Sequence, residues 1–243
     1  MRQFTIAIAA VCVIAAAGGL TACSGPGAAS PACPHPSYVT SAKFGTWHLA
    51  PYAVANDMWN SDGYQVTQTL YACSYRNWYV VARLNGGSAA VKTYPDAQKN
   101  FSDPRISALK SVTSTFAETS PGTGIYEDAY DIWLDGIASP GSTEVMVWTE
   151  NHGQRPGGSV AGTATVGGRS YTVWRKGSYI AFVANTNFTS GTVNLLEFLT
   201  RVMAKGWMPG NSTLSAVDYG VELVSTDNVP ATFGFSDFSV TAS

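Results

Sequence analysis

The chain of 243 residues carries little charge: only 12% of its residues are Asp, Glu, Lys or Arg, and the formal net charge is −2. It contains no run of basic residues, so nothing in it indicates a nucleic-acid partner. Its three histidines, His35, His48 and His152, have no ligand spacing, so we expect neither a metal site nor a cofactor. A Gly-x-Ser-x-Gly nucleophile turn and a phosphate-binding glycine loop are also missing.

The long apolar run at residues 4–19 is too short for a membrane-spanning helix, which needs about 20 apolar residues. With Arg2 before it and Leu-Thr-Ala-Cys at 20–23 after it, the run is typical of a secretory signal. The last four residues resemble a bacterial lipobox, whose cysteine is acylated. We therefore predict a signal peptide at 1–22, a lipid on Cys23 and an extracytoplasmic protein held at a membrane. Plain secretion after cleavage is the alternative.

Cysteines are few, and their positions fit export. Of the four, Cys12 lies in the signal and Cys23 is the lipid candidate, which leaves Cys33 and Cys73. An even pair in an oxidising compartment predicts a disulfide. Residues 23–36, rich in Gly, Ala, Ser and Pro, are expected to be a short tether, and residues 37–243 a single domain.

Short β-branched and aromatic runs, separated by Gly, Pro, Asn and Ser, predict strands through most of this domain. The runs are 38–47, 52–59, 66–74, 78–84, 89–94, 111–118, 125–134, 144–149, 163–166, 170–175, 179–184, 215–224 and 231–241. Their spacing indicates an all-β fold of two antiparallel sheets, a sandwich or jelly roll. Residues 193–205 differ, because their apolar residues recur with a helical period; Gly191-Thr192 precede them and Gly206 follows. We expect one amphipathic helix packed on the outside of a sheet.

The run Thr-Glu-Val-Met-Val-Trp at 143–148 is the most informative. As a strand it places Glu144, Met146 and Trp148 on one face and two valines on the other. A carboxylate beside a thioether and an indole suits a surface that meets a sugar. Glu222 lies in a second strand-like run, and two carboxylates on facing strands are the minimum for cleaving a glycosidic bond.

From about residue 52 to the C-terminus the chain resembles glycoside hydrolase family 12, the β-jelly-roll (concanavalin-like) endoglucanases. The resemblance rests on an ordered set of segments. They are Asn-Asp-Met-Trp at 56–59, Val-Lys-Thr-Tyr at 91–94, Ala-Tyr-Asp-Ile-Trp at 129–133, Glu-Val-Met-Val-Trp at 144–148, Val-Gly-Gly-Arg-Ser-Tyr at 166–171, Phe-Val-Ala-Asn-Thr-Asn at 182–187 and Gly-Val-Glu at 220–222.

The resemblance implies a retaining mechanism in which Glu144 is the nucleophile and Glu222 the acid/base. Asp131 is then expected beside Glu144, hydrogen-bonded to it and tuning its protonation. A retaining pair needs its carboxyl groups about 5–5.5 Å apart.

Substrate contacts are implied for Asn56, Trp59, Met146 and Trp148, with the two tryptophans either stacking on sugars or packing. The chain departs from the family where Leu223 and Val224 follow the acid/base in place of Pro and an aromatic ring, and where Asp57 replaces a common Asn.

One rival reading concerns Glu150, which shares the strand parity of Glu144; the Asn-His-Gly that follows it favours a loop edge instead. Two functions remain open. The first is a monomeric endo-β-1,4-glucanase acting on cellulose, mixed-linkage glucan or xyloglucan. The second is a non-catalytic β-glucan-binding lipoprotein on the same fold. A nucleophile and an acid are of no use to a binding module, so the sequence favours the enzyme.

Overall fold

The structure, a computed structural model, describes residues 33–243. The predicted signal peptide at 1–22, the predicted lipid on Cys23 and most of the predicted tether at 23–36 lie outside these residues. Within 33–243, no helix is long and apolar enough to cross a membrane.

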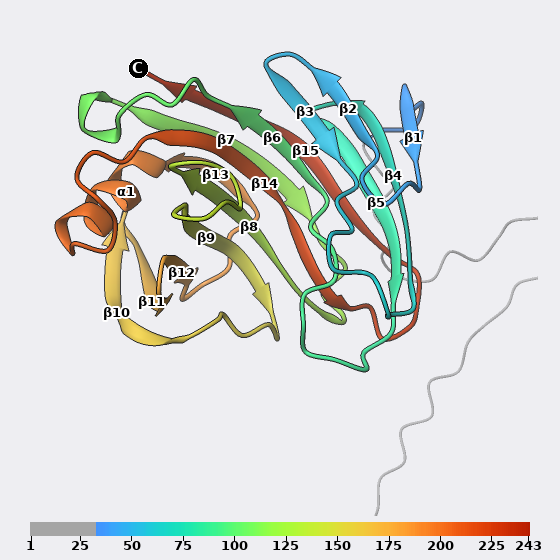
Figure 1. The fold of residues 1–243 in the computed structure, drawn as a ribbon. Coiled ribbons are helices and arrows are strands. Elements are labelled where there is room, and N and C mark those ends of the chain that lie inside the picture. The colour runs from blue at the N-terminus through green and yellow to red at the C-terminus, as the bar shows by residue number, and fades with distance from the viewer. Residues whose placement is uncertain (1–32) are drawn as a thin grey trace, which may run out of the picture.

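Two curved sheets and one α-helix build the described part of the chain, which confirms the predicted all-β sandwich (Figure 1). In spatial order the six-stranded sheet contains β1 (Tyr38–Thr40), β4 (Val66–Ser74), β5 (Asn77–Leu84), β15 (Ala231–Ala242), β7 (Val112–Thr119) and β13 (Ser190–Asn194). The nine-stranded sheet contains β10 (Ser159–Val166), β11 (Arg169–Lys176), β12 (Tyr179–Ala184), β9 (Thr143–His152), β8 (Ile125–Leu134), β14 (Leu214–Ser225), β6 (Asp96–Asn100), β3 (Tyr52–Ala55) and β2 (Thr46–Leu49). A 3-10 turn, η1, spans Ile106–Ala108.

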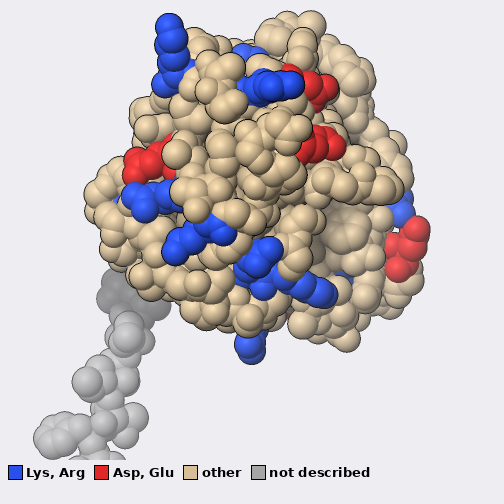
Figure 2. All heavy atoms as spheres, turned by 60° about the vertical axis from the view of Figure 1, so that its left-hand side comes forward, with Lys and Arg blue, Asp and Glu red and all other residues tan. Residues whose placement is uncertain are grey.

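Aromatic rings join the two sheets at the centre of the core. Phe116 of β7 lies 4.8 Å from the ring of Tyr219 on β14 and 5.7 Å from that of Tyr130 on β8. All three are buried, and each such ring removes a large apolar area from water. The outer surface has few charges, and Figure 2 shows a face on which uncharged residues predominate.

β8 is buried on both faces, unlike the outer strands. Because strand side chains alternate, Tyr126, Asp128 and Tyr130 point toward the six-stranded sheet. Glu127 and Asp131 point to the opposite side, the outer face of the nine-stranded sheet. We call this second side the site face; Ala129 of β8 also belongs to it.

Two strand predictions were wrong. Residues 89–94 form no strand and make only an isolated bridge, Thr93 to Leu223, because the buried Lys92 side chain donates instead to the carbonyl oxygens of Ser88, Ala90 and Val224. The strand follows at β6. The predicted run at 38–47 is divided by a turn in which Gly45 N donates to Ala42 O, so β1 and β2 join different sheets.

The predicted helix is confirmed as α1 (Leu195–Ala204), but its surroundings differ from the prediction. Residues 191–192 do not cap it, because they pair with β7 as part of β13. Phe198 lies 5.1 Å from the ring of Tyr171 and 5.0 Å from that of Phe182, both core residues of β11 and β12. The helix therefore covers the inner face of the nine-stranded sheet rather than an outer face, and it closes one end of the core (Figure 1).

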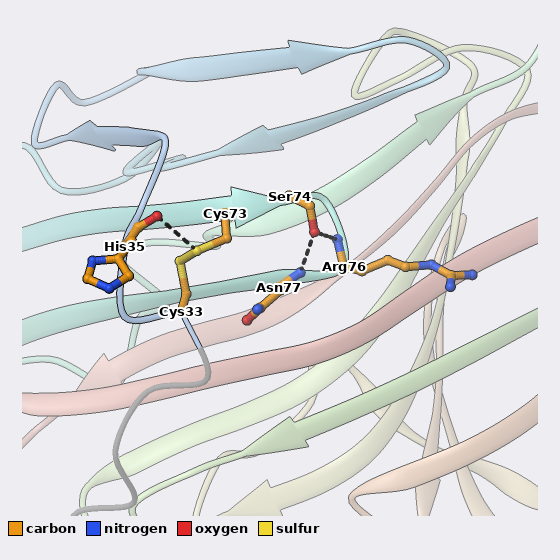
Figure 3. Close-up of a disulfide and its surroundings, with 6 residues drawn as sticks. All are labelled: Cys33, His35, Cys73, Ser74, Arg76 and Asn77. Atoms are coloured by element: carbon orange, nitrogen blue, oxygen red, sulfur yellow. Dashed lines mark hydrogen bonds between the residues drawn. A yellow bond between two sulfur atoms is a disulfide. The ribbon is translucent and has the colours of Figure 1, made fainter.

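The predicted disulfide between Cys33 and Cys73 is present, with the two Cα atoms 5.7 Å apart (Figure 3). The carbonyl oxygen of His35 lies 3.4 Å from the Sγ of Cys73. The turn after β4 is held by Ser74 Oγ, which accepts hydrogen bonds from the N–H groups of Arg76 and Asn77. The disulfide thus ties the start of the described chain to the end of β4.

Candidate active site

Three neighbouring strands bring the predicted catalytic residues to the site face. Glu144 on β9 is opposite Trp133 on β8, and Glu222 on β14 is opposite Glu127 on β8. Directly opposed residues point to the same side of a sheet, so Glu144 and Glu222 share a face with Asp131, which lies between them along β8. The apolar neighbours of these two glutamates, Val145, Val221 and Leu223, point the other way and belong to the core.

Burial and mutual repulsion set the protonation of the two carboxyl groups. Desolvation, reinforced by the negative charge of Glu222, raises the pKa of Glu144 to about 7. Desolvation also raises the pKa of Glu222, against a hydrogen bond with Glu127 that lowers it. Both side chains remain partly exposed. Near neutral pH the pair can therefore hold one ionised and one protonated carboxyl group, as acid and nucleophile require.

Asp131 is nearly buried, and its pKa is raised well above the usual range by desolvation and then by the charge of Glu144. The expected hydrogen bond to Glu144 is not among the hydrogen bonds of residues 33–243, and Asp131 Oδ1 has no partner there. The structure thus brings Asp131 into the electrostatic reach of Glu144 without a direct bond between them.

Glu127 is a member of this site that sequence reasoning missed. It is fully buried, and desolvation followed by the charge of Glu222 raises its pKa well above the usual range. A protonated Glu127 can donate to Glu222, which explains why the contact favours the ionised form of Glu222. Alternation along 125–134 would have found it, because Glu127 shares the parity of Asp131.

Three aspartates extend the acidic network to β6, to β14 and to the segment that follows β3. Desolvation raises the pKa of Asp57 to about 6, with the charge of Glu222 adding to it. Asp96 and Asp218 are buried and have raised pKa values, mainly through desolvation. The replacement of a common Asn by Asp57 therefore places another titratable group near Glu222.

Gly220 of the Gly-Val-Glu segment has a packing reason. A Cβ atom there would lie 2.1 Å from the carbonyl oxygen of Pro95 and 2.8 Å from the Cα of Asp96. Only glycine allows β6 to approach β14 so closely, and this approach positions Asp96 beside the site face.

The predicted substrate contacts divide into accessible and inaccessible residues. Trp59 is 49% exposed, whereas Met146 and Trp148 are each 1% exposed and pack together, with Trp148 Nε1 3.4 Å from Met146 Sδ. Asn56 is fully buried: its amide donates to Ala42 O and accepts from Gln68 Nε2. Of the four, Trp59 alone presents a large surface to a ligand.

β11 and β12 each add an aromatic residue that the sequence analysis did not include. Tyr179 is opposite Glu144 in the parallel pairing of β12 with β9. Desolvation, and then the charge of Glu222, raises the pKa of Tyr179 above its usual range, so it remains a neutral hydroxyl. On β11, Trp174 lies under the guanidinium of Arg155, 5.3 Å from its ring centroid.

Glu150 is excluded from the site by a β-bulge. β9 continues through residue 152, so Glu150 is a strand residue rather than the predicted loop edge. Between Trp148 and Glu150 the register shifts, and Glu150 comes opposite Asp128. The bulge reverses the parity, and Tyr126 Oη donates to Glu150 Oε1 at 2.8 Å on the other side of the sheet.

Known proteins resemble this chain in sequence and in fold. Endoglucanase A of Aspergillus kawachii is 27% identical over 202 residues, covering 75% of this chain and 84% of its own. The inactive glycoside hydrolase XLP1 of Phytophthora nicotianae is 26% identical, covering 76% and 86%. The xyloglucanase domain of NopAA from Sinorhizobium fredii, solved in complex with cellobiose, has the same fold, with a TM-score of 0.76 and 24% identity over 86% of this chain and 100% of that one.

The family model described as glycosyl hydrolase family 12 matches residues 50–243, which include every strand of the nine-stranded sheet except β2. The family expected from the ordered segments is thereby confirmed, and with it the prediction of a glycoside hydrolase. This chain belongs to glycosyl hydrolase family 12.

Proposed function

We propose that the protein hydrolyses internal β-1,4-glucosidic bonds of a soluble β-glucan with retention of anomeric configuration. The observation that supports this most is the pair Glu144 and Glu222, two partly exposed carboxylates on one face whose charges influence each other. Glu144 attacks the anomeric carbon while Glu222 protonates the leaving oxygen. Glu222 then accepts a proton from the water that releases the sugar.

Asp131 and Glu127 support the pair from β8. Asp131, whose own pKa is raised, stays protonated beside Glu144, so a single negative charge is kept on this part of the site face. Glu127, protonated beside Glu222, favours the ionised form of Glu222 and so eases the release of the Glu222 proton to the leaving oxygen. Trp59 offers an exposed ring to a glucose unit, and Tyr179 a hydroxyl beside Glu144.

The substrate class follows from the surroundings of the site as well as from the relatives. The site face carries carboxylates and aromatic rings, which suit a neutral polysaccharide and disfavour an anionic one. Named relatives act on glucans and on xyloglucan, so cellulose, mixed-linkage glucan and xyloglucan all belong to the proposal. A reducing-end assay on the three soluble polymers identifies the preferred one.

Stereochemistry tests the mechanism separately. Two inversions restore the β configuration, so fresh hydrolysate should show the β anomer first by proton NMR, before mutarotation. An initial α anomer would mean that a water, not Glu144, attacks the sugar, and the nucleophile assignment would be wrong.

A non-catalytic glucan-binding protein is the second candidate, favoured by one observation: an inactive relative has a similar sequence over most of its length. One experiment distinguishes the two candidate functions. A binding protein would retain its affinity for glucan, measured by calorimetry, while releasing no reducing ends at any pH.

The cellular position remains a proposal from the sequence. A lipid on Cys23 would hold the enzyme at a membrane outside the cytoplasm, where the Cys33–Cys73 disulfide is stable. Mass spectrometry of the mature N-terminus tests it: an unmodified start later in the chain means plain secretion.

A further inference from the structure

A second group of carboxylates lies between the two sheets, away from the site face. Glu118 comes from β7 of the six-stranded sheet, and Asp128 and Glu150 come from β8 and β9 of the nine-stranded sheet. One oxygen from each lies within 4.8 Å of the others. We call these three residues the inter-sheet acid cluster. Asp128 follows Glu127 directly, so consecutive residues of β8 belong to the two different groups of acids.

Several carboxylate oxygens of the cluster are buried without a hydrogen-bond partner. Glu118 is 6% exposed, and neither of its carboxylate oxygens has a hydrogen-bond partner. Asp128 is fully buried; its Oδ2 accepts from Ser120 Oγ at 2.8 Å, but its Oδ1 has no partner. Buried polar groups are normally satisfied, so three unpaired oxygens at one point indicate a missing partner.

That partner is not a basic side chain. The three ion pairs found within residues 33–243 involve other acids: Asp62, Asp237 and Glu197. The ring of His152 stacks on Tyr126, but its Nδ1 is paired with the carbonyl oxygen of Gly124. Three carboxyl groups this close, two of them buried, repel one another when they are ionised, and a cation between them would relieve that repulsion.

We propose that the inter-sheet acid cluster binds a divalent cation of the calcium class and joins the two sheets through it. The three oxygens lie within 4.8 Å of one another, close enough to share one cation. Calcium takes carboxylate oxygens in a flexible geometry at about 2.3–2.6 Å, whereas magnesium requires near-ideal octahedral geometry and usually keeps several waters, which three protein carboxylates suit less well. An all-carboxylate set also disfavours zinc and copper, which prefer nitrogen or sulfur.

The chain offers a path for the ion and support for its ligands. Glu150 is only partly buried, so the cluster is open to solvent on one side. Tyr126 Oη orients Glu150, and Ser120 Oγ orients Asp128, which leaves the opposite oxygens of both carboxylates for a cation. The expectation of no metal rested on the scattered histidines, and this proposal departs from it because the ligands here are carboxylates from strands distant in sequence.

The test measures thermal unfolding of the full mature chain after treatment with a chelator, with calcium, magnesium or zinc then added at pH about 7.5. About 10 mM calcium should raise the unfolding midpoint by about 3–6 °C, and magnesium by clearly less. Glu118→Gln should lose at least about nine-tenths of the calcium shift. Without calcium it should be as stable as the wild type or more stable, because it removes repulsion. Glu197→Gln, which changes an exposed acid on α1, is the matched control and should keep the full shift.

If Glu118→Gln fails to fold, Glu150→Gln replaces it, since Glu150 is partly exposed and tolerates an amide. Calorimetric titration of the wild type should give one calcium per chain. Absence of any shift with all three metals would overturn the proposal and leave a cluster that shares protons. An equal calcium shift in wild type, Glu118→Gln and Glu150→Gln would place the ion elsewhere and overturn it as well.

Discussion

The two groups of carboxylates, one on the site face and one between the sheets, use the same side chains in different surroundings. Both have raised pKa values, and desolvation is the largest cause in each. They differ in access. Glu144 and Glu222 are partly exposed on an outer face that can accept a polymer, whereas Glu118 and Asp128 are enclosed by two sheets. The first group can perform chemistry on a large substrate, and the second has room for no more than protons or a small ion.

The comparison shows how closely fold and chemistry are connected in a sandwich. Each strand of the nine-stranded sheet supplies side chains to the core and to the site face in turn. A single bulge in β9 moves Glu150 from one group to the other. Small changes of strand register therefore decide whether an acidic side chain lies on the site face or between the two sheets.

The largest effect is expected from neutralising the site face. Glu144→Gln removes the proposed nucleophile, so turnover of every glucan should fall by at least about 10³-fold while the thermal midpoint stays close to that of the wild type. Glu222→Gln should cause a similar loss on polysaccharides. On an aryl glucoside with a good leaving group, whose departure needs no protonation, formation of the covalent intermediate should survive far better.

The matched control for these variants is Glu197→Gln, which changes an exposed acid paired with Arg201. It should leave turnover within about twofold of the wild type. Near-full turnover in Glu144→Gln would contradict the proposal that the site face carries the catalytic carboxylates. Neither group of acids would then have a demonstrated role in catalysis.

The next largest effect concerns stability. The loss of the disulfide gives a value against which the stabilisation by a cation in the inter-sheet acid cluster can be compared. Replacing Cys33 and Cys73 together by Ser opens a loop of 40 residues in sequence. In the chain-entropy account this should lower the free energy of unfolding by roughly 3–4 kcal/mol, and often by less. Urea unfolding measures it. Turnover at 25 °C should not change, because the bond is remote from the site face; a parallel loss of turnover would show that the two regions are coupled.

The pH profile should separate the roles of Glu144 and Glu127. Glu144 must be ionised to attack, and its pKa is raised to about 7, so kcat/KM should fall as the pH falls through about 7. The alkaline limit is set by loss of the proton from Glu222. Because the two carboxyls interact, both limits belong to the pair. The profile should therefore be bell-shaped, and a flat acid limb down to pH 5 would be inconsistent with a buried nucleophile.

Glu127 variants sharpen the same measurement. Glu127→Leu removes the group that donates to Glu222, which destabilises the ionised form of Glu222 and raises its pKa. The alkaline limit should then move up by about one pH unit. Glu127→Gln keeps a donor and should leave the limit near that of the wild type. Equal shifts in both variants would mean that Glu127 acts through packing alone.

Much of the fold and the central part of the site could be predicted from sequence. Alternation in 143–148 placed Glu144 and Met146 on one face correctly, and the ordered segments gave the family. Neither depends on contacts between distant strands. Glu127 was within reach of the same alternation argument, but it lies outside the segments that carry the family resemblance.

The rest depends on register and packing, which sequence patterns do not contain. The bulge after Trp148 could not be seen in the chain, so Glu150 was placed at a loop edge. The inter-sheet acid cluster joins Glu118 to residues of the opposite sheet. Asn56, identified from a segment of the family, uses its side-chain amide in hydrogen bonds within the fold and is not available to a substrate. Each error comes from a contact between segments far apart along the chain.

The smallest effect is expected at Trp59, the accessible aromatic among the predicted substrate contacts. Its side chain is 49% exposed, and it follows Asp57, whose pKa responds to Glu222. Trp59→Ala should therefore raise KM for a soluble β-glucan about three- to tenfold with kcat nearly unchanged, since a stacked ring binds substrate and transition state alike. Val39→Ala, an exposed apolar change on β1 of the other sheet, is the control and should alter neither constant. If Trp59→Ala lowers kcat but not KM, the ring positions the reacting sugar and belongs with the carboxylates of the site face. If neither constant changes, polymer binding depends on residues of β11 and β12 such as Trp174 instead.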